Sequence, residues 1–228
     1  MGKLLAENGG VMESTQTDES TDAGRFDRLA KEWDVAPMHL DRTRDVANLM
    51  RHKLALSGRE ALEVGAGTGL LSFALAANLG RILATDPSAG MVDVLKGKIE
   101  RSGIGNIKAL RTDDSLEGVA GPFDLVMSQM ALHHIKDVDM FLRRALTMIR
   151  QGGDIAIADL DTEDGSFHGG EVTDVHHGFD REDLGRRLAS AGFEDIAFET
   201  VHVMKRPVGE AMVDFPIFLC VAKVPQSL

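Results

Sequence analysis

The 228-residue sequence predicts an α/β fold in which helices cover both faces of a doubly wound, mostly parallel sheet. The first observation is that short apolar runs bounded by turn residues alternate with segments of helical periodicity, as expected of parallel strands joined by helices. The second is a glycine-rich loop, Gly65-Ala66-Gly67-Thr68-Gly69, between the first apolar run and the first helical pattern. Loops of this kind place a nucleotide-like ligand at the carboxyl ends of parallel strands.

The amino-terminal part divides into a polar tail and a pair of helices. Residues 1–23 are rich in Glu, Ser, Thr, Asp and Gly and are expected to be mobile. The apolar positions of residues 25–56 predict two helices with a break near Ala36-Pro37. Phe26 and Trp33 lie seven positions apart on one helical face. They form either an apolar lid or an anchor that holds the helix on the sheet, and both interpretations stay open.

The remaining elements follow from the apolar runs in chain order. The strands expected in the parallel part are residues 61–64, 82–85, 107–111, 123–127 and 155–160. The expected helices are residues 70–79, 138–149 and 180–191, the last with Asp180 as N-cap and Gly192 as C-cap. The stretch Arg150-Gln151-Gly152-Gly153 is expected to form a turn before the fifth strand. Two closing strands, residues 196–204 and 215–223, are expected to pair antiparallel.

Acidic side chains stand at the ends of the first three expected strands. Glu63 comes just before the glycine loop, where its carboxylate repels a pyrophosphate and attracts an ammonium group. Asp86 follows the second strand, where a carboxylate accepts hydrogen bonds from two ribose hydroxyls. Asp113 and Asp114 follow the third strand and can accept from an adenine amino group. A ligand with a ribose, an adenine and a cationic amino-acid tail fits these residues better than NAD.

The glycine loop also lacks the residues of two phosphate-binding motifs. The dinucleotide pattern G-x-G-x-x-G requires glycine where this chain has Leu70. A P-loop ends in Gly-Lys-Ser/Thr, and there is no lysine between Arg59 and Lys96. Dehydrogenase chemistry is therefore a distant alternative.

Five segments in this order resemble the successive motifs of a known family. The segments are LEVGAGTG, ATDPSAGM, RTDDS, FDLVMSQMALHHIKD and IRQGGDIAIADL. Together they resemble class I S-adenosylmethionine-dependent methyltransferases, and most closely the small-molecule branch that includes the ubiquinone/menaquinone-biosynthesis C-methyltransferases. The resemblance covers roughly residues 24–224, and five motifs at the right spacing make it specific. The departures are mild: Gln151 stands where proline is usual and Thr112 where glycine is common.

The resemblance implies a fold, a cofactor and a set of binding residues. The fold is a Rossmann-like sheet of seven strands with an antiparallel last strand and a helical amino-terminal cap over the cofactor cleft. The cofactor is S-adenosylmethionine, which leaves as S-adenosylhomocysteine after in-line displacement in a water-poor cleft. The implied cofactor-binding residues are Glu63, Gly65, Ala66, Gly67, Thr68, Gly69, Asp86, Pro87, Met91, Asp113, Asp114, Ser128, Gln129 and Met130.

Two residues are candidates for catalysis. The resembling family keeps residues after the fourth strand beside the transferred methyl group. We prefer His133 over His134 for proximity to the cleft, because one imidazole there can orient an acceptor or take its proton near neutral pH. Asp159, at the end of the fifth strand, is the second candidate base. The alternative is that the two histidines only pack and hydrogen-bond the following turn.

A polar, glycine-rich segment over residues 161–180 is expected to be a mobile acceptor-binding loop. Its possible metal ligands are His168, Glu171, Asp174, His176 and His177. Adjacent histidines in an extended segment point to opposite sides, and mixed acidic and histidine loops are usually only solvated. The sequence therefore predicts no metal site. The other histidines are interpreted as surface or core residues: His39, His52 and His202.

Composition favours one domain, residues 24–228, that acts on a small molecule. The net charge is −11 and the basic residues are scattered, which argues against a nucleic-acid acceptor and weakly favours a neutral or cationic one. No apolar run approaches the length of a membrane-spanning helix, about 20 residues. The first residues also lack the basic and then apolar order of a signal peptide. The single cysteine, Cys220, is expected in the core, which excludes chemistry that needs several thiolates. The cytoplasm is the expected compartment.

Three functions remain compatible with the sequence. The leading one is a methyltransferase for a small molecule, the second is a methyltransferase for a protein or nucleic acid, and the third is a non-catalytic S-adenosylmethionine-binding module. Glu63, Asp86 and Asp113 predict cofactor binding in all three but do not establish turnover. Neither the acceptor nor the oligomeric state can be read from the sequence.

Overall fold

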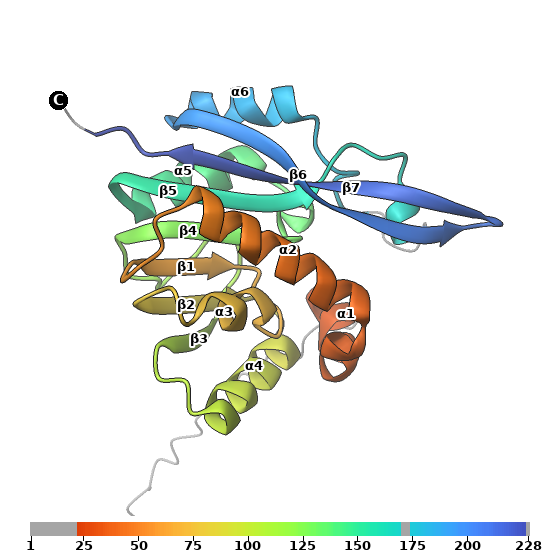
Figure 1. The fold of residues 1–228 in the computed structure, drawn as a ribbon, viewed down its shortest axis with the longest axis horizontal. Helices are drawn as coiled ribbons and strands as arrows, with labels where there is room; N and C mark the ends of the chain where they lie inside the picture. Colours follow the sequence, from red (N-terminus) through yellow and green to blue (C-terminus); the bar gives the residue numbers. More distant parts are fainter. Residues whose placement is uncertain (1–21, 170–173, 227–228) are drawn as a thin grey trace, which may run out of the picture.

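A seven-stranded sheet forms the centre of the chain in a computed structural model, which describes residues 22–169 and 174–226. The strand order is β3-β2-β1-β4-β5-β7-β6 (Figure 1). The strands are β1 (Glu60–Val64), β2 (Arg81–Asp86), β3 (Ile107–Arg111), β4 (Phe123–Gln129), β5 (Ile149–Leu160), β6 (Glu194–Val208) and β7 (Ala211–Lys223).

The strand directions confirm the predicted doubly wound, mostly parallel sheet. Strands β1 to β5 pair parallel, and β7 pairs antiparallel with both β5 and β6. The chain order reverses between β1 and β4, which lie side by side at the centre. In sheets of this type such a reversal opens a crevice at the carboxyl ends of the strands, where ligands bind.

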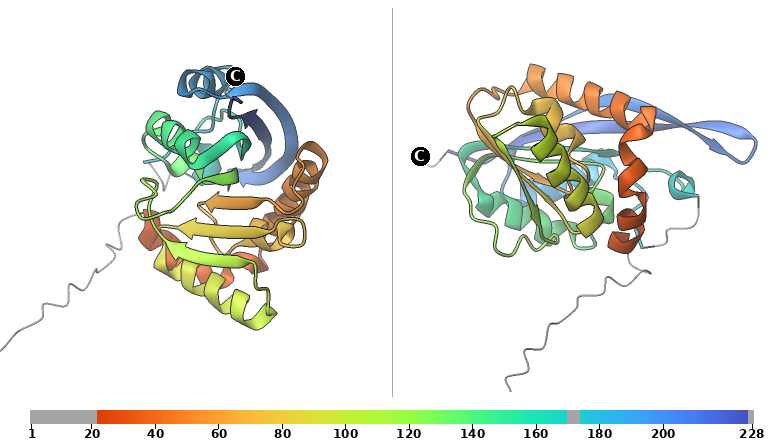
Figure 2. Two further views of the ribbon diagram at one scale, coloured as in Figure 1. Left: turned by 90° about the vertical axis from the view of Figure 1, so that its left-hand side faces the viewer. Right: turned by 90° about the horizontal axis from the view of Figure 1, so that it is seen from below.

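Helices pack on both faces of the sheet (Figures 1 and 2). One face buries the apolar sides of α2, α3 and α4 through residues such as Met50, Leu75 and Leu95. The opposite face buries α5 and α6 through residues such as Leu142 and Leu188. The bounds of these helices are α2 (Pro37–Lys53), α3 (Leu70–Leu75), α4 (Ala89–Ser102), α5 (Val138–Met148) and α6 (Arg181–Ala191). The predicted caps of α6, Asp180 and Gly192, are confirmed.

The amino-terminal segment forms the predicted pair of helices, joined by a short 3-10 helix. α1 spans Asp22–Leu29, the 3-10 helix η1 spans Ala30–Val35, and Pro37 begins α2. Proline suits a first helical position because its missing N–H has no partner to lose there. α1 therefore begins inside the segment predicted as a tail, and residues 1–21 lie outside the described residues.

The predicted bounds of four elements, β5, α3, β6 and β7, were wrong. Residues 150–153 are not a turn but part of β5, where the pairing with β4 shifts register and Gly152 takes a φ of +72°. Two adjacent glycines thus allow a bulge in a continuing strand rather than a reversal. α3 ends at Leu75, although Leu79 still packs in the core. β6 and β7 are longer than predicted and meet at Gly209, forming a hairpin that extends beyond the sheet (Figure 1).

Two short 3-10 helices complete the architecture beside the carboxyl ends of the strands. η2 (Leu132–His134) follows β4, and η3 (Ser166–His168) lies in the segment after β5. Among the described residues, no helix combines the length and the apolar composition needed to cross a membrane. Cys220 is buried in β7, as predicted.

Candidate functional site

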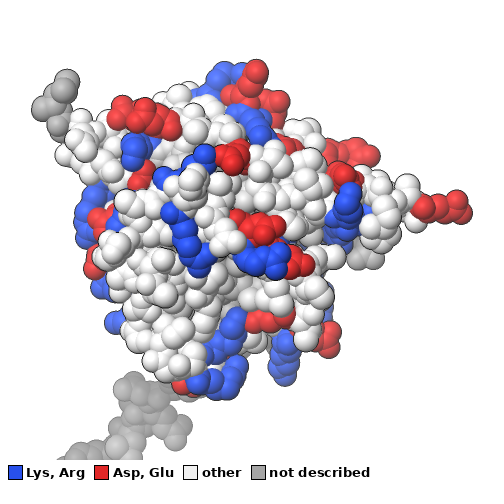
Figure 3. Space-filling view, viewed as in Figure 1, with Lys and Arg blue, Asp and Glu red and all other residues white. Residues whose placement is uncertain are grey.

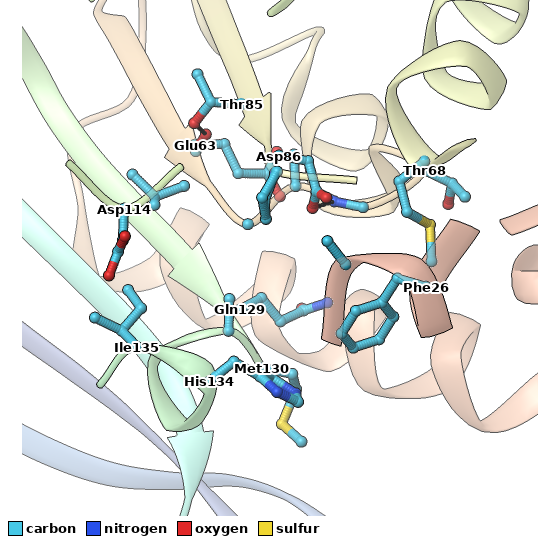
Figure 4. A pocket seen from close by; sticks show the side chains of 18 of the residues that line it. Phe26, Glu63, Thr68, Thr85, Asp86, Asp114, Gln129, Met130, His134 and Ile135 are labelled. Carbon is cyan, nitrogen blue, oxygen red and sulfur yellow. Dashed lines mark hydrogen bonds between the residues drawn. The ribbon is translucent and has the colours of Figure 1, made fainter. Parts of the chain in front are cut away.

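A cavity of about 940 Å³ opens at the carboxyl ends of β1, β2 and β4, beneath the amino-terminal helices (Figure 4). Most residues predicted to bind a cofactor line it. They are Glu63, Gly65, Ala66, Gly67, Thr68, Asp86, Pro87, Met91, Asp113, Asp114, Gln129 and Met130. Gly69 and Ser128 are not among the lining residues, because Gly69 caps α3 and Ser128 is buried within β4.

Close packing explains two glycines of the loop. A Cβ atom on Gly65 would stand 2.2 Å from the Cβ of Ala131, which also lines the cavity. A Cβ atom on Gly69 would stand 2.4 Å from Leu95, and Gly69 has a φ of +82°. A side chain at either position would require its neighbour to move, and the left-handed φ of both residues, +69° at Gly65 and +82° at Gly69, favours glycine in addition.

Glu63 is a buried acid at the end of β1. Its carboxylate accepts a hydrogen bond from the hydroxyl of Ser72 on α3. Burial raises the pKa of Glu63 to about 7, since the surrounding protein replaces the water that would stabilise its charge. A buried carboxyl of this kind is available to pair with a cationic ligand group.

Asp86 ends β2 and binds the backbone of the glycine loop. Its two carboxylate oxygens accept from the N–H groups of Gly67, at 2.8 Å, and Ser88, at 2.9 Å. Burial raises the pKa of Asp86 to about 6, although both backbone hydrogen bonds oppose that shift. The carboxylate is therefore held at the edge of the cavity in a fixed orientation.

The loop after β3 supplies the far end of the cavity. Thr112, Asp113 and Asp114 all line it. Asp113 accepts from the backbone N–H of Ser115 at 3.0 Å, which closes a tight turn. Asp114 points into the cavity in Figure 4.

The segment after β4 forms the opposite wall. Gln129 donates a hydrogen bond to the hydroxyl of Thr43 at 2.9 Å, and its side-chain oxygen is buried without a partner. Met130 adopts a φ of +55°, an unfavourable conformation for a residue with a side chain. Such strain costs about 1–3 kcal/mol and concentrates at ligand sites.

The amino-terminal helices close the cavity and are fastened to its loops. Phe26 and Trp33 both line it, with ring centroids 5.7 Å apart in an edge-on arrangement. This placement favours the lid interpretation over the anchor. Asp34 accepts hydrogen bonds from the hydroxyl of Thr68 and, at 2.5 Å, from the ammonium group of Lys98. η1 is thereby fastened to the glycine loop.

Arg42 is a pocket residue that sequence reasoning missed. It is 5% exposed and lines the cavity from α2. Its Nη1 donates to the sulfur of Met204 at 3.6 Å, and its Nε is buried without a partner. Burial lowers its pKa to about 10. Nothing in the run Asp41-Arg42-Thr43-Arg44 distinguishes this arginine from the exposed Arg44.

The structure corrects the placement of the candidate catalytic residues. His134 lines the cavity, whereas His133 is 1% exposed and Asp159 is 0% exposed. The two buried residues pair, with His133 Nδ1 2.6 Å from a carboxylate oxygen of Asp159. Burial alone would raise the pKa of Asp159, but the charge and hydrogen bond of His133 outweigh it and hold that pKa below its usual value. Preferring His133 over His134 for proximity to the cleft was therefore wrong.

The expected histidine grouping also differs from the observed one. His168 lies with His133 and His134, not with His176 and His177. His176 turns its Nε2 to the carbonyl of Ile135 at 3.0 Å instead. Burial lowers the pKa of His168 to about 3, and the neighbouring histidines add to the effect. Asp174 lines the cavity, while Glu171 lies outside the described residues.

Comparison with known proteins agrees with this geometry. A family model described as a methyltransferase domain matches residues 61–153, which include the glycine loop, Asp86 and the segment after β4. These matches support the predicted resemblance to the class I S-adenosylmethionine-dependent methyltransferases. S-adenosylmethionine is accordingly its cofactor, as the sequence predicted.

Individual relatives show how far the likeness extends. A ubiquinone biosynthesis O-methyltransferase of Methylocella silvestris is 31% identical over 167 residues, covering 64% of this chain and 65% of that protein. The protein of the same description from Azorhizobium caulinodans is 29% identical, with 68% of each chain covered. A SAM-dependent methyltransferase from Aquifex aeolicus has the same fold, with a TM-score of 0.64, 18% identity, and 90% and 99% of the two chains covered. The chain thus spans about two thirds of the length of the curated relatives it matches.

Proposed function

We propose that this chain transfers the methyl group of S-adenosylmethionine to a small-molecule acceptor. The observation that carries the proposal is the match between charged groups in the cavity and those of the cofactor. Two buried carboxyls, Glu63 and Asp86, and one buried guanidinium, Arg42, line the same cavity at the reversal of strand order. The cofactor brings an ammonium group, a ribose diol and a carboxylate.

Each charged residue has one matching group. Asp86 accepts from the two ribose hydroxyls, and Asp113 or Asp114 accepts from the adenine amino group. Glu63 faces the methionyl ammonium group, while Arg42 holds the methionyl carboxylate by a charge-assisted hydrogen bond. The glycine loop lets the backbone approach the ligand closely.

The remaining wall of the cavity is assigned to the acceptor. Phe26, Trp33 and His134 lie there, beside the strained Met130. Phe26 packs edge-on against His134, with ring centroids 5.2 Å apart. An apolar wall of this kind excludes water and holds the acceptor in line with the methyl group, which supplies most of the rate acceleration.

The acceptor atom we favour is a hydroxyl oxygen. The relatives from Methylocella silvestris and Azorhizobium caulinodans are both named O-methyltransferases. The net charge of the chain favours a neutral or cationic acceptor, yet Arg25, Arg28, Arg42 and Lys136 line the cavity together with its acids. Local charge in the cavity is therefore mixed and accommodates an acceptor that becomes an oxyanion. We assign the buried pair His133 and Asp159 a positioning role for the neighbouring His134.

A nucleic-acid acceptor is disfavoured by the surface charge. On the face shown in Figure 3, basic and acidic side chains are interspersed rather than gathered into a basic patch. A nucleic-acid acceptor would require such a patch to neutralise phosphates.

The experiment is a screen of phenolic, catecholic and other small acceptors, with S-adenosylhomocysteine as the measured product. The proposal predicts product formation that depends on one acceptor class and is lost when Phe26→Ala removes the lid ring. The matched control is Phe198→Ala, which removes an aromatic ring that contacts Phe218 away from the cavity. Cofactor binding without product for any small acceptor, together with turnover on a protein or nucleic acid, would contradict the proposal.

A further inference from the structure

Three imidazole side chains from two distant parts of the chain meet beside the cavity. His133 and His134 belong to η2, and His168 belongs to η3. One ring nitrogen of each lies within 4.8 Å of the others. The ring centroids are 4.1 Å apart for His133 and His134, 5.2 Å for His133 and His168, and 5.6 Å for His134 and His168.

The first ring is oriented by a buried carboxylate. Asp159 accepts from Nδ1 of His133 at 2.6 Å and from the backbone N–H of Leu160 at 2.7 Å. This hydrogen bond occupies Nδ1 of His133 and leaves Nε2 as the ring nitrogen that faces a ligand. A carboxylate behind a histidine is the arrangement that orients metal-binding histidines and raises their basicity.

The segment that carries His168 is held in place, but the ring Nε2 of His168 has no hydrogen-bond partner. η3 lies between Gly165 and Gly169, both in left-handed conformations, and its Phe167 is buried against Phe215. The Nε2 atom of His168 is buried and has no hydrogen-bond partner. Leaving a buried polar nitrogen unpaired costs about 1–3 kcal/mol, a cost that a bound ion at this position removes.

We propose that His133, His134 and His168 form a binding site for one divalent transition metal, with zinc as the favoured ion. Three histidines with one open position are the ligand set of catalytic zinc sites. Zinc–nitrogen distances of about 2.0–2.1 Å place tetrahedral ligand atoms about 3.3 Å apart. The observed limit of 4.8 Å is closed by small rotations of the His134 and His168 rings.

The fourth position of the ion faces the acceptor end of the cavity, because His134 lines that cavity. The positive charges of Arg25 and Arg206 act on His168. These charges repel a bare dication but attract an anionic fourth ligand, such as an acceptor oxygen that has lost its proton. The carboxylate of Asp159, which is hydrogen-bonded to His133, offsets part of the positive charge of the ion and the arginines.

This role rests on the proposed function. A bound metal lowers the pKa of an acceptor hydroxyl that it ligates, and the proton leaves to solvent. The oxygen lone pair then forms the new bond to the methyl carbon. The carbon–sulfur bond breaks, and its electron pair stays on the sulfur of S-adenosylhomocysteine.

The test begins with metal binding itself. The full-length protein, stripped with a chelator, is titrated with zinc chloride by calorimetry, and with cobalt chloride by visible absorption. We expect one saturable site per chain, lost in His168→Ala and in His134→Ala. The matched control His52→Ala removes an exposed histidine of α2 and keeps the site. Asp159→Asn weakens zinc binding about 10- to 100-fold if it only orients His133.

A second measurement separates the metal site from the proposed function. Thermal stabilisation by S-adenosylmethionine is recorded for the wild type and His168→Ala, which also shows that the variant is folded. Stabilisation of both, with zinc binding by the wild type alone, supports the proposal. An absence of saturable zinc and cobalt binding by the wild type, or equal binding by His168→Ala, overturns it. Failure of the acceptor screen alone overturns the function and leaves the metal site standing.

Discussion

Replacing Glu63 with glutamine tests two effects of its buried charge: a lower stability of the free protein and a tighter binding of the cofactor. Glu63→Gln keeps the size of the side chain and an oxygen that accepts from the hydroxyl of Ser72. It removes the carboxylate that burial makes costly and that is assigned to the cofactor's ammonium group. The variant should therefore be more stable without cofactor and bind the cofactor less tightly.

The magnitude follows from the raised pKa of Glu63, which lies at about 7 against an ordinary value of 4.5. Because the folded pKa is raised, the stability contributed by this group is complete below pH 4.5 and is lost as pH rises through about 7. At 1.36 kcal/mol per pH unit, the full loss is about 3 kcal/mol. For a domain of this size, that corresponds to about 6–12 °C in Tm.

The assay is a series of melting curves between pH 5 and pH 9 without cofactor. Glu63→Gln should melt higher than the wild type at pH 8.5, and the difference should shrink toward pH 5. The control Glu100→Gln, at an exposed position of α4, should follow the wild type at every pH.

Cofactor affinity provides the second half of the same test. A hydrogen bond to a charged group contributes about 1.5–3 kcal/mol, so Kd for S-adenosylmethionine at pH 8 should rise about 10- to 150-fold in Glu63→Gln. A variant with the pH profile and affinity of the wild type would refute the reasoning on both counts. If Glu63→Gln were more stable but bound the cofactor as tightly as the wild type, only the proposed contact between Glu63 and the ammonium group would be contradicted.

Three other variants test the neighbouring contacts. Asp86→Asn should raise Kd for S-adenosylmethionine about 10- to 150-fold by weakening the ribose hydrogen bonds, with turnover kept at saturating cofactor; reduced turnover at saturation would give Asp86 a part in the reaction itself. Gly65→Ala should destabilise the protein by about 1–3 kcal/mol more than Gly58→Ala in the same melting assay, because its new Cβ meets Ala131 at 2.2 Å, whereas Gly58 has a similar left-handed φ but no atom within 4 Å. His133→Ala should cost about 1.5–3 kcal/mol in chemical denaturation by removing the ring hydrogen bond to the buried Asp159 carboxylate, and a neutral result would show that the pair is not structural.

The sequence predicted those parts of the fold and site that depend only on residues close together in the chain. The glycine loop and the acids at the ends of β1 and β2 lie within a few residues of their strands, so strand prediction alone placed Glu63 and Asp86 at the cavity. The same holds for the helix from Asp180 to Gly192, whose ends are capped by adjacent residues. Gly152 was misjudged because a glycine pair permits both a turn and a bulge, and only pairing with β4 decides between them.

The missed residues depend on contacts between distant segments. Arg42 is buried because α2 packs against β6, where Met204 receives its hydrogen bond. His168 meets His133 because η3 packs against β6 and β7, and local periodicity in the sequence cannot predict such a contact between distant segments. Of His133 and His134, only the turn of η2 decides which ring faces the cavity.

Ligand-dependent stability tests the central claim most directly. Melting curves of the wild type are recorded with S-adenosylmethionine, S-adenosylhomocysteine or NAD at the same concentration. A ligand at 100 times its Kd stabilises by about 2.7 kcal/mol, or about 5–11 °C for a domain of this size. A shift with both adenosyl ligands and none with NAD is the predicted result. A preferential shift with NAD, or no shift with S-adenosylmethionine, would contradict the account.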